Sequence, residues 1–120
     1  KLRVVRDQVG CPTWSRMIAE GTAFAIKQVV EHADRSAFSG AYHLAARGLT
    51  SWHGFASQII SSLPEAERKC REIEGITTAE YPTPAQRPAY SVLDCGKLKK
   101  TFGIELPDWE ASLRLVLDQP

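Results

Sequence analysis

Hydrophobic and polar positions along the chain follow two periods, one typical of strands and one typical of amphipathic helices. Residues 2–8 (LRVVRDQ) contain adjacent β-branched side chains and are followed by a turn signal at Gly10 and Pro12, which predicts a strand. Residues 14–33 carry apolar side chains at helical spacing, and Thr13 stands where a helix N-cap is expected. The apolar face of this helix is predicted to consist of Ile18, Thr22, Ala25, Ile26, Val29 and Val30.

The middle of the chain is predicted to hold a second helix between two further strands. Residues 41–46 (AYHLAA) read as a short buried strand, and residues 71–77 give a weaker strand signal. A helix is expected from a cap at Thr50 or Ser51 to about Ser62. Its apolar face is predicted to be Trp52, Phe55, Ala56, Ile59 and Ile60, with Trp52 as a core residue.

A proline-rich loop and two short helices complete the chain. Residues 78–88 hold three prolines, which exclude a central strand or a helix interior and favour an extended loop with few conformations. Asp94 is expected to cap a helix that Gly103 ends, and the last helix should begin at residues 107–108 and bury Trp109. The order predicts a small mixed α/β fold with short strands and about four helices, whose thin sheet needs a partner surface.

Composition narrows the classes of function. The chain has 120 residues, 43% hydrophobic and 24% charged, with a net charge of +1, so neither nucleic acid nor a membrane surface is predicted as a partner. No apolar run approaches the roughly 20 residues that span a bilayer. Three cysteines without a C-x-x-C pair favour reduced thiols and a cytoplasmic location. Because the chain opens without Met and directly in a strand, we expect a fragment or a processed product.

The motifs of a self-sufficient catalytic site do not occur in the sequence. There is no G-x-G-x-x-G phosphate loop and no G-x-S-x-G elbow, and none of the three tyrosines has a lysine four positions later. The three histidines lack metal-ligand spacing. We therefore predict no catalytic, cofactor-binding or metal-binding residue in this chain.

Three stretches carry a family signature. The first is residues 5–13, of the form V-x-D-Q-x-G-x-P-T; the second is residues 40–52, with GAYHL, Gly48 and TSW. The third is residues 81–98, where YPTPAQRP continues as R-P-x-x-S-x-L-D-x-x-K-L. In order and spacing, over nearly the whole chain, they resemble the carboxyl-terminal region of dTDP-4-dehydrorhamnose reductases, which belong to the extended short-chain dehydrogenase/reductases.

The resemblance implies a function that this chain would share with a missing part. Family members reduce dTDP-4-dehydro-L-rhamnose to dTDP-L-rhamnose with NADPH or NADH, in dTDP-rhamnose biosynthesis. The cofactor site and a Tyr-x-x-x-Lys pair lie in an amino-terminal Rossmann domain, so residues 1–120 would be the substrate-binding domain and would be inactive alone. The expected partners are a dTDP-sugar and that Rossmann domain; a homodimer stays open. Some members dimerise through Mg²⁺ bound by glutamates, but residues 14–16 offer no acid, so a magnesium-bridged dimer is not expected.

Five residues are candidates for substrate binding. Arg87 lies in the stiff proline loop, and its guanidinium suits a pyrophosphate; the alternative is an arginine that bonds loop carbonyls. Gln8 ends the first strand, where α/β sheets bind ligands, or else satisfies its own turn. Trp14 could stack on a base or sugar or pack in the core. Tyr81 and Tyr90 flank the proline loop and could line the pocket.

Two other functions remain open at this stage. The first is a non-catalytic relative that keeps the fold as a regulatory or interaction subunit. The second is an independent small binding module with no upstream domain. Turnover by the full-length parent would exclude the first, and the coding sequence upstream of Lys1 would decide the second.

Overall fold

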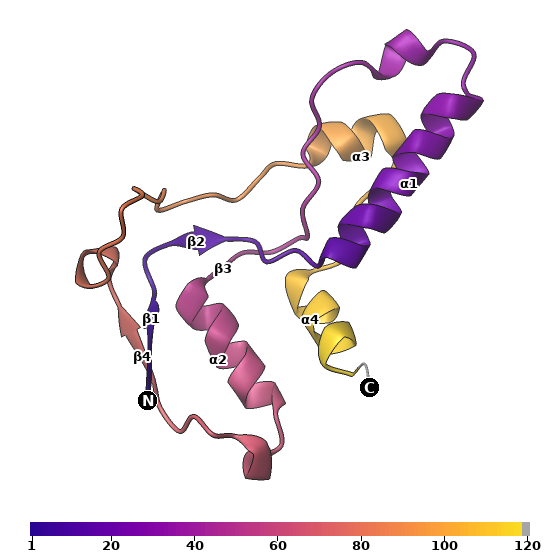
Figure 1. Cartoon of the computed structure of the whole chain (residues 1–120). Coiled ribbons are helices and arrows are strands. Elements are labelled where there is room, and N and C mark those ends of the chain that lie inside the picture. The colour runs from indigo at the N-terminus through magenta and orange to yellow at the C-terminus, as the bar shows by residue number, and fades with distance from the viewer. Residues whose placement is uncertain (119–120) are drawn as a thin grey trace.

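The first and fourth strands pair side by side although they lie about 70 residues apart in sequence (Figure 1). The computed structural model describes residues 1–118, which form a flat, elongated molecule with extents of 56 × 36 × 20 Å. The predicted mixed α/β fold with short strands and four α-helices is confirmed for these residues. In chain order the elements are β1 Leu2–Val5, β2 Val9–Gly10, α1 Ser15–Glu31, β3 Thr50–Ser51, α2 Trp52–Ser62, β4 Ile73–Ile76, α3 Gly96–Phe102 and α4 Trp109–Leu117, with short 3₁₀ turns at Arg35–Phe38, Glu65–Glu67 and Thr78–Glu80.

The strands form two separate two-stranded ladders. Strand β1 pairs with β4 in parallel, with Leu2 opposite Ile73, and β2 pairs with β3 antiparallel, with Val9 opposite Ser51. The weak strand signal at residues 71–77 is therefore confirmed. The single strand predicted for residues 2–8 is wrong in its extent, because the chain turns at residues 6–8 and changes partner there.

Residues 41–46 do not form the predicted strand. Among residues 1–118, no strand lies beside this segment, and the backbone groups of Tyr42, His43 and Leu44 make no hydrogen bond. A strand needs a neighbour to accept and donate its ladder bonds, and the described part of the chain supplies none. The segment is instead held near its two ends, where Lys97 Nζ donates to Ala41 O at 3.0 Å and Arg47 N donates to Pro107 O at 3.1 Å.

The side chain of Thr13 does not cap α1 as predicted. The N-cap of α1 is Trp14, without a side-chain hydrogen bond, while the Thr13 hydroxyl donates to Cys11 O at 3.1 Å and accepts from Ala46 N at 3.1 Å. Thr13 therefore ties the entrance of α1 to the end of the 41–46 segment. The Thr13 hydroxyl accepts from the backbone N–H of Ala46, 33 residues away, and not from an N–H in the first turn of α1. The sequence alone does not reveal this long-range partner.

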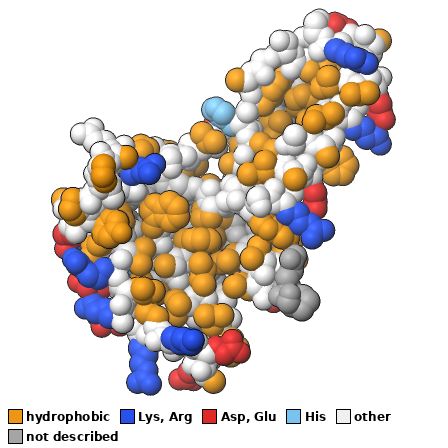
Figure 2. Space-filling model, in the orientation of Figure 1, with side chains coloured by type: hydrophobic (Ala, Val, Ile, Leu, Met, Phe, Trp, Pro, Cys, Tyr) orange, Lys and Arg blue, Asp and Glu red, His pale blue; other side chains and the backbone are white. Residues whose placement is uncertain are grey.

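Helix α1 buries only part of the predicted face, because Ala25 and Val29 are half-buried and the other members are exposed. Gly21 is buried, and a Cβ there would lie 3.3 Å from Leu44 Cδ2, so the missing side chain permits close packing on residue 44. Of the predicted apolar face, Ile26 and Val30 are 57% and 58% exposed. Hydrophobic side chains consequently lie open along the α1 arm of the molecule (Figure 2).

The core sits where α2 and α4 pack together. Trp109 and Leu113 are buried with Ala46, and the ring of Phe55 meets Trp109 edge-on, with centroids 5.8 Å apart. The predicted start of α2 is confirmed, because Ser51 Oγ accepts from Gly54 N at 3.1 Å. For α3, the predicted end at Gly103 is confirmed, with φ +68°. The N-cap is Cys95 and not the predicted Asp94, whose Oδ1 accepts from Gly96 N, one residue beyond the cap position.

Candidate ligand-binding cavity

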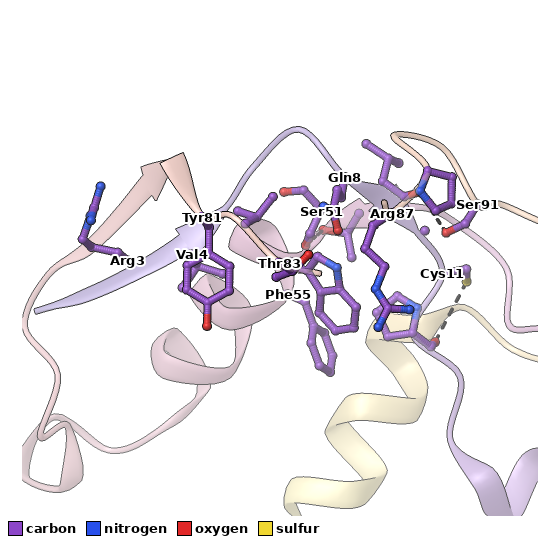
Figure 3. Close-up of a pocket in the computed structure, with 17 residues that line it drawn as sticks. Arg3, Val4, Gln8, Cys11, Ser51, Phe55, Tyr81, Thr83, Arg87 and Ser91 are labelled. Atoms are coloured by element: carbon purple, nitrogen blue, oxygen red, sulfur yellow. Dashed lines mark hydrogen bonds between the residues drawn. The ribbon is translucent and has the colours of Figure 1, made fainter. Parts of the chain in front are cut away.

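A cavity of about 780 Å³ opens where the turn after β1, the start of α2 and the proline loop meet (Figure 3). The first wall comes from β1, β2 and the turn between them, the second from β3 and the first turn of α2, and the third from the loop at residues 81–91. Three segments far apart in sequence therefore enclose one space. It is lined by Arg3, Val4, Val5, Gln8, Val9, Gly10, Cys11, Pro12, Thr50, Ser51, Trp52, Phe55, Tyr81, Thr83, Arg87, Pro88 and Ser91.

The proline loop is anchored at its start by the turn after β1. Both carboxylate oxygens of Asp7 accept from Thr78 N, at 2.9 and 3.0 Å, and the Thr78 hydroxyl donates to Asp7 Oδ1 at 2.8 Å. Gln8 Nε2 adds a bond to Thr78 Oγ1 at 3.1 Å. These donors stabilise the carboxylate, so the backbone and hydroxyl of Thr78 lower the pKa of Asp7. The prediction that Asp7 fixes the turn is confirmed, and its partner lies 71 residues away.

The other end of the loop is anchored on β2. Val9 N donates to Ala89 O at 2.8 Å, and Ser91 N donates to Val9 O at 2.9 Å. Between these anchors the chain contains Pro82, Pro84 and Pro88, whose fixed φ angles reduce the number of conformations it can adopt. A loop held at both ends and stiffened between them presents its side chains to the cavity at low entropic cost.

Three of the five predicted substrate-binding residues lie on this cavity. Gln8, Tyr81 and Arg87 all line it, and Figure 3 shows them around the same opening. Trp14 and Tyr90 are not among the lining residues. Trp14 is half-buried at the start of α1 with the Arg16 guanidinium 5.7 Å from its ring, and Tyr90 is 62% exposed near the end of the loop.

The guanidinium of Arg87 has no counter-charge among residues 1–118. None of the ion pairs in this part of the chain includes it, and it makes no hydrogen bond to a loop carbonyl there. Arg3, at the other side of the cavity, is different, because its guanidinium lies 3.8 Å from both Glu74 and Glu80. Arg87 is therefore the cation that the cavity offers to an anionic group.

Sequence reasoning missed the aromatic wall of the cavity. Trp52 was expected in the core, but it is 59% exposed and lines the cavity beside Phe55. Helical periodicity cannot distinguish a residue that faces the core from one in the first turn that faces a loop, because both fall on the apolar stripe. Arg3 and Thr83 were also missed; nothing in their local sequence marks them.

Cys11 lines the cavity as a structural thiol. Its Sγ donates to Ala46 O at 2.9 Å. Burial raises the pKa of the Cys11 thiol, and the nearby Cys95 and Asp108 raise it further, so the neutral form is favoured.

Within the described residues, no three His, Cys, Asp or Glu side chains gather in a way that could hold a metal ion. The lining of the cavity therefore combines a neutral thiol with aromatic side chains and the guanidinium of Arg87.

The fold and the cavity define a mixed α/β domain with an open cavity, one wall of which is an anchored loop whose Arg87 has no ion-pair partner among residues 1–118. Comparison with known proteins gives the family. The model of the RmlD substrate binding domain matches residues 1–120, and the chain belongs to this family.

Individual relatives agree with the family. A dTDP-4-dehydrorhamnose reductase of Burkholderia thailandensis is 47% identical over 120 residues, which cover 96% of this chain and 40% of the relative. The crystal structure of a dTDP-4-dehydrorhamnose reductase from Clostridium acetobutylicum matches with a TM-score of 0.81 at 32% identity, covering 98% of this chain and 38% of that one. The reductase from Bacillus anthracis, solved in complex with NADP, matches with a TM-score of 0.76 at 28% identity over 98% and 38% of the two chains.

The chain spans about 40% of the length of the curated relatives that it matches. None of the helices in residues 1–118 combines the length and apolar character needed to cross a membrane.

Proposed function

We propose that residues 1–120 are the substrate-binding domain of a reductase that converts dTDP-4-dehydro-L-rhamnose to dTDP-L-rhamnose with NADPH. The observation that carries this proposal is the convergence of Gln8, Tyr81 and Arg87 on one cavity in a chain of this family. The reductases from Burkholderia thailandensis and Clostridium acetobutylicum support the reaction, and the NADP complex from Bacillus anthracis supports the cofactor.

In this proposal the chain binds and orients the substrate. The diphosphate accepts charge-assisted hydrogen bonds from the free guanidinium of Arg87, which the stiff loop holds in place. Gln8 keeps its Thr78 bond and has its amide oxygen free to accept from a substrate hydroxyl. NADPH supplies hydride, and it binds to the amino-terminal Rossmann domain, because this chain has no dinucleotide phosphate loop. The chain alone is inactive.

The Rossmann domain is also the proposed partner of the exposed face of α1. Ile18, Ile26 and Val30 are 38–58% exposed on this helix, and burying such side chains stabilises an interface by about 25 cal/mol per Å². The backbone groups of residues 42–44 make no hydrogen bond within residues 1–118, and the side chain of Leu44 packs on Gly21 of the same helix. These groups can pair with a strand of the partner. A partner that supplies a strand and an apolar surface would pair with the backbone of residues 42–44 and would also cover the exposed side chains of α1.

We also propose a cytoplasmic location for the protein. Three free cysteines support the reducing cytoplasm as the location. The described residues contain no acidic cluster that could hold a metal ion, so the proposal includes no magnesium-bridged dimer. It allows a homodimer through another surface.

The test is turnover by the full-length parent. Purified parent protein is supplied with dTDP-4-dehydro-L-rhamnose and NADPH, and NADPH absorbance and dTDP-L-rhamnose are followed. The proposal predicts one NADPH consumed per dTDP-L-rhamnose formed. A parent that binds the sugar nucleotide without consuming NADPH would instead be the non-catalytic regulatory subunit.

A further inference from the structure

Trp52 presents an indole ring to the cavity. Its side chain is 59% exposed although it belongs to the apolar stripe of α2, whereas Trp109 is 7% exposed in the core. The backbone at this position is fixed by the helix cap, because Trp52 is the first residue of α2 and follows Ser51, whose hydroxyl accepts from Gly54 N. A large apolar ring left open to water gains free energy when a ligand covers it.

Trp52 shares the cavity wall with a residue that packs against the core. Phe55, one turn along α2, lines the same cavity and packs edge-on against Trp109 of the core. The proline loop contributes Thr83 and Arg87 to the same lining (Figure 3). The cavity therefore places a flat aromatic surface on the helix side and a free cation on the loop side.

These two features suit two different parts of a nucleoside diphosphate sugar. Arg87 matches the diphosphate, and a flat indole matches either the pyrimidine base or one face of the hexose. The choice between them rests on the proposed function. The hexose carbon that is reduced must meet a cofactor bound outside this chain, so the hexose points out of the cavity and the base stays in it.

We propose that Trp52 is the stacking platform for the pyrimidine base of the substrate, with Arg87 on the diphosphate. Stacking of a base on an aromatic side chain contributes affinity that does not depend on the sugar. Trp52 is thus a binding residue for the nucleotide part, and its contribution is the same for the free nucleoside diphosphate and for its sugar conjugate.

The experiment compares ligands on the full-length parent. Binding of dTDP and of dTDP-L-rhamnose is measured by calorimetry for the wild type, Trp52→Ala and Trp52→Phe. Trp52→Ala is expected to weaken both ligands by the same factor, roughly 5- to 100-fold, and Trp52→Phe by much less. Because Trp52 is exposed, neither change should alter the unfolding temperature, which is recorded for each variant.

Fluorescence gives a direct readout of stacking. Addition of dTDP should quench tryptophan emission in the wild type and in Trp14→Phe, which removes an indole outside the cavity, but not in Trp52→Phe. Equal dTDP affinity in Trp52→Ala and wild type overturns the inference, and so does a loss confined to dTDP-L-rhamnose, which would place the hexose on the ring. In either case normal turnover by the wild-type parent leaves the proposed function standing; a wild-type parent that binds neither ligand overturns both.

Discussion

Gly48 and Gly103 both have positive φ angles in the left-handed region, and they differ in how closely other side chains pack on them. Gly48 has φ +80° and Gly103 has φ +68°. A Cβ at Gly48 would lie 3.0 Å from Trp109 Cδ1, whereas a Cβ at Gly103 would have nothing within 4 Å. Substituting each glycine in turn therefore distinguishes the cost of backbone strain alone, at Gly103, from the cost of strain and close packing together, at Gly48.

We predict that Gly48→Ala destabilises the protein more than Gly103→Ala. Both variants carry the cost of a side chain in the left-handed region, about 1–2 kcal/mol, and only Gly48→Ala also displaces the core Trp109. Urea unfolding at constant pH measures both free energies. Equal losses would mean that Trp109 moves without cost.

Asp7 makes stability depend on acid pH. Thr78 lowers its pKa in the folded state, so the folded pKa lies below the unfolded one. The stabilisation is present above the unfolded pKa, about pH 4, and is lost as the pH falls through the folded pKa. The carboxylates of Asp34, Glu80 and Glu105, whose pKa values are also lowered, act in the same direction.

Asp7→Asn should therefore flatten the acid limb of the stability curve. The difference between the urea midpoints at about pH 7 and about pH 3 is expected to shrink relative to wild type. Glu67→Gln is the control, because the Glu67 side chain makes no hydrogen bond or ion pair within residues 1–118. If both variants keep the wild-type difference, the Asp7–Thr78 anchor does not contribute.

At the scale of elements, the sequence predicts features that depend on neighbouring residues better than features that depend on distant parts of the chain. The start of α2 at Ser51, the end of α3 at Gly103 and the character of the proline loop follow from side-chain capping, backbone freedom and ring geometry, which act within a few residues. The strand predicted for residues 41–46 depends on a neighbour that residues 1–118 do not provide. The same applies to α1, whose apolar stripe was read correctly as a pattern but is only partly covered.

The exposed face of α1 leads to a prediction about the parent protein. If the Rossmann domain covers this face, amide hydrogens of α1 and of residues 42–44 exchange more slowly in the parent than in the 120-residue chain. Ile26→Ser with Val30→Ser should lower the unfolding temperature of the parent, because both side chains become buried there. The control is Phe24→Ser, at a residue 63% exposed on the other side of the helix. Equal exchange in the parent and the isolated chain would argue against this docking.

At the scale of the whole molecule, the sequence predicted some of the residues that line the cavity, but not how they are arranged around it. Arg87 and Gln8 were singled out for their chemistry and their place after a strand or within a stiff loop, and the fold brings them together. Trp52 could not be identified as a lining residue from the sequence, because it faces the cavity only if the proline loop passes on its side of α2. That choice is set by the Asp7–Thr78 and Val9–Ser91 bonds, which join residues 71 and 82 positions apart.

The central claim is that the anchored proline loop and the turn after β1 hold an anionic sugar nucleotide through Arg87. Calorimetric titration of the full-length parent with dTDP tests it most directly, with Arg87→Ala compared against Arg71→Ala, an exposed arginine outside the cavity. The account predicts that Arg87→Ala loses about 1.5–3 kcal/mol of binding free energy, as for a charge-assisted hydrogen bond, and that Arg71→Ala binds like the wild type. Equal affinity of the Arg87→Ala variant and the wild type would contradict it.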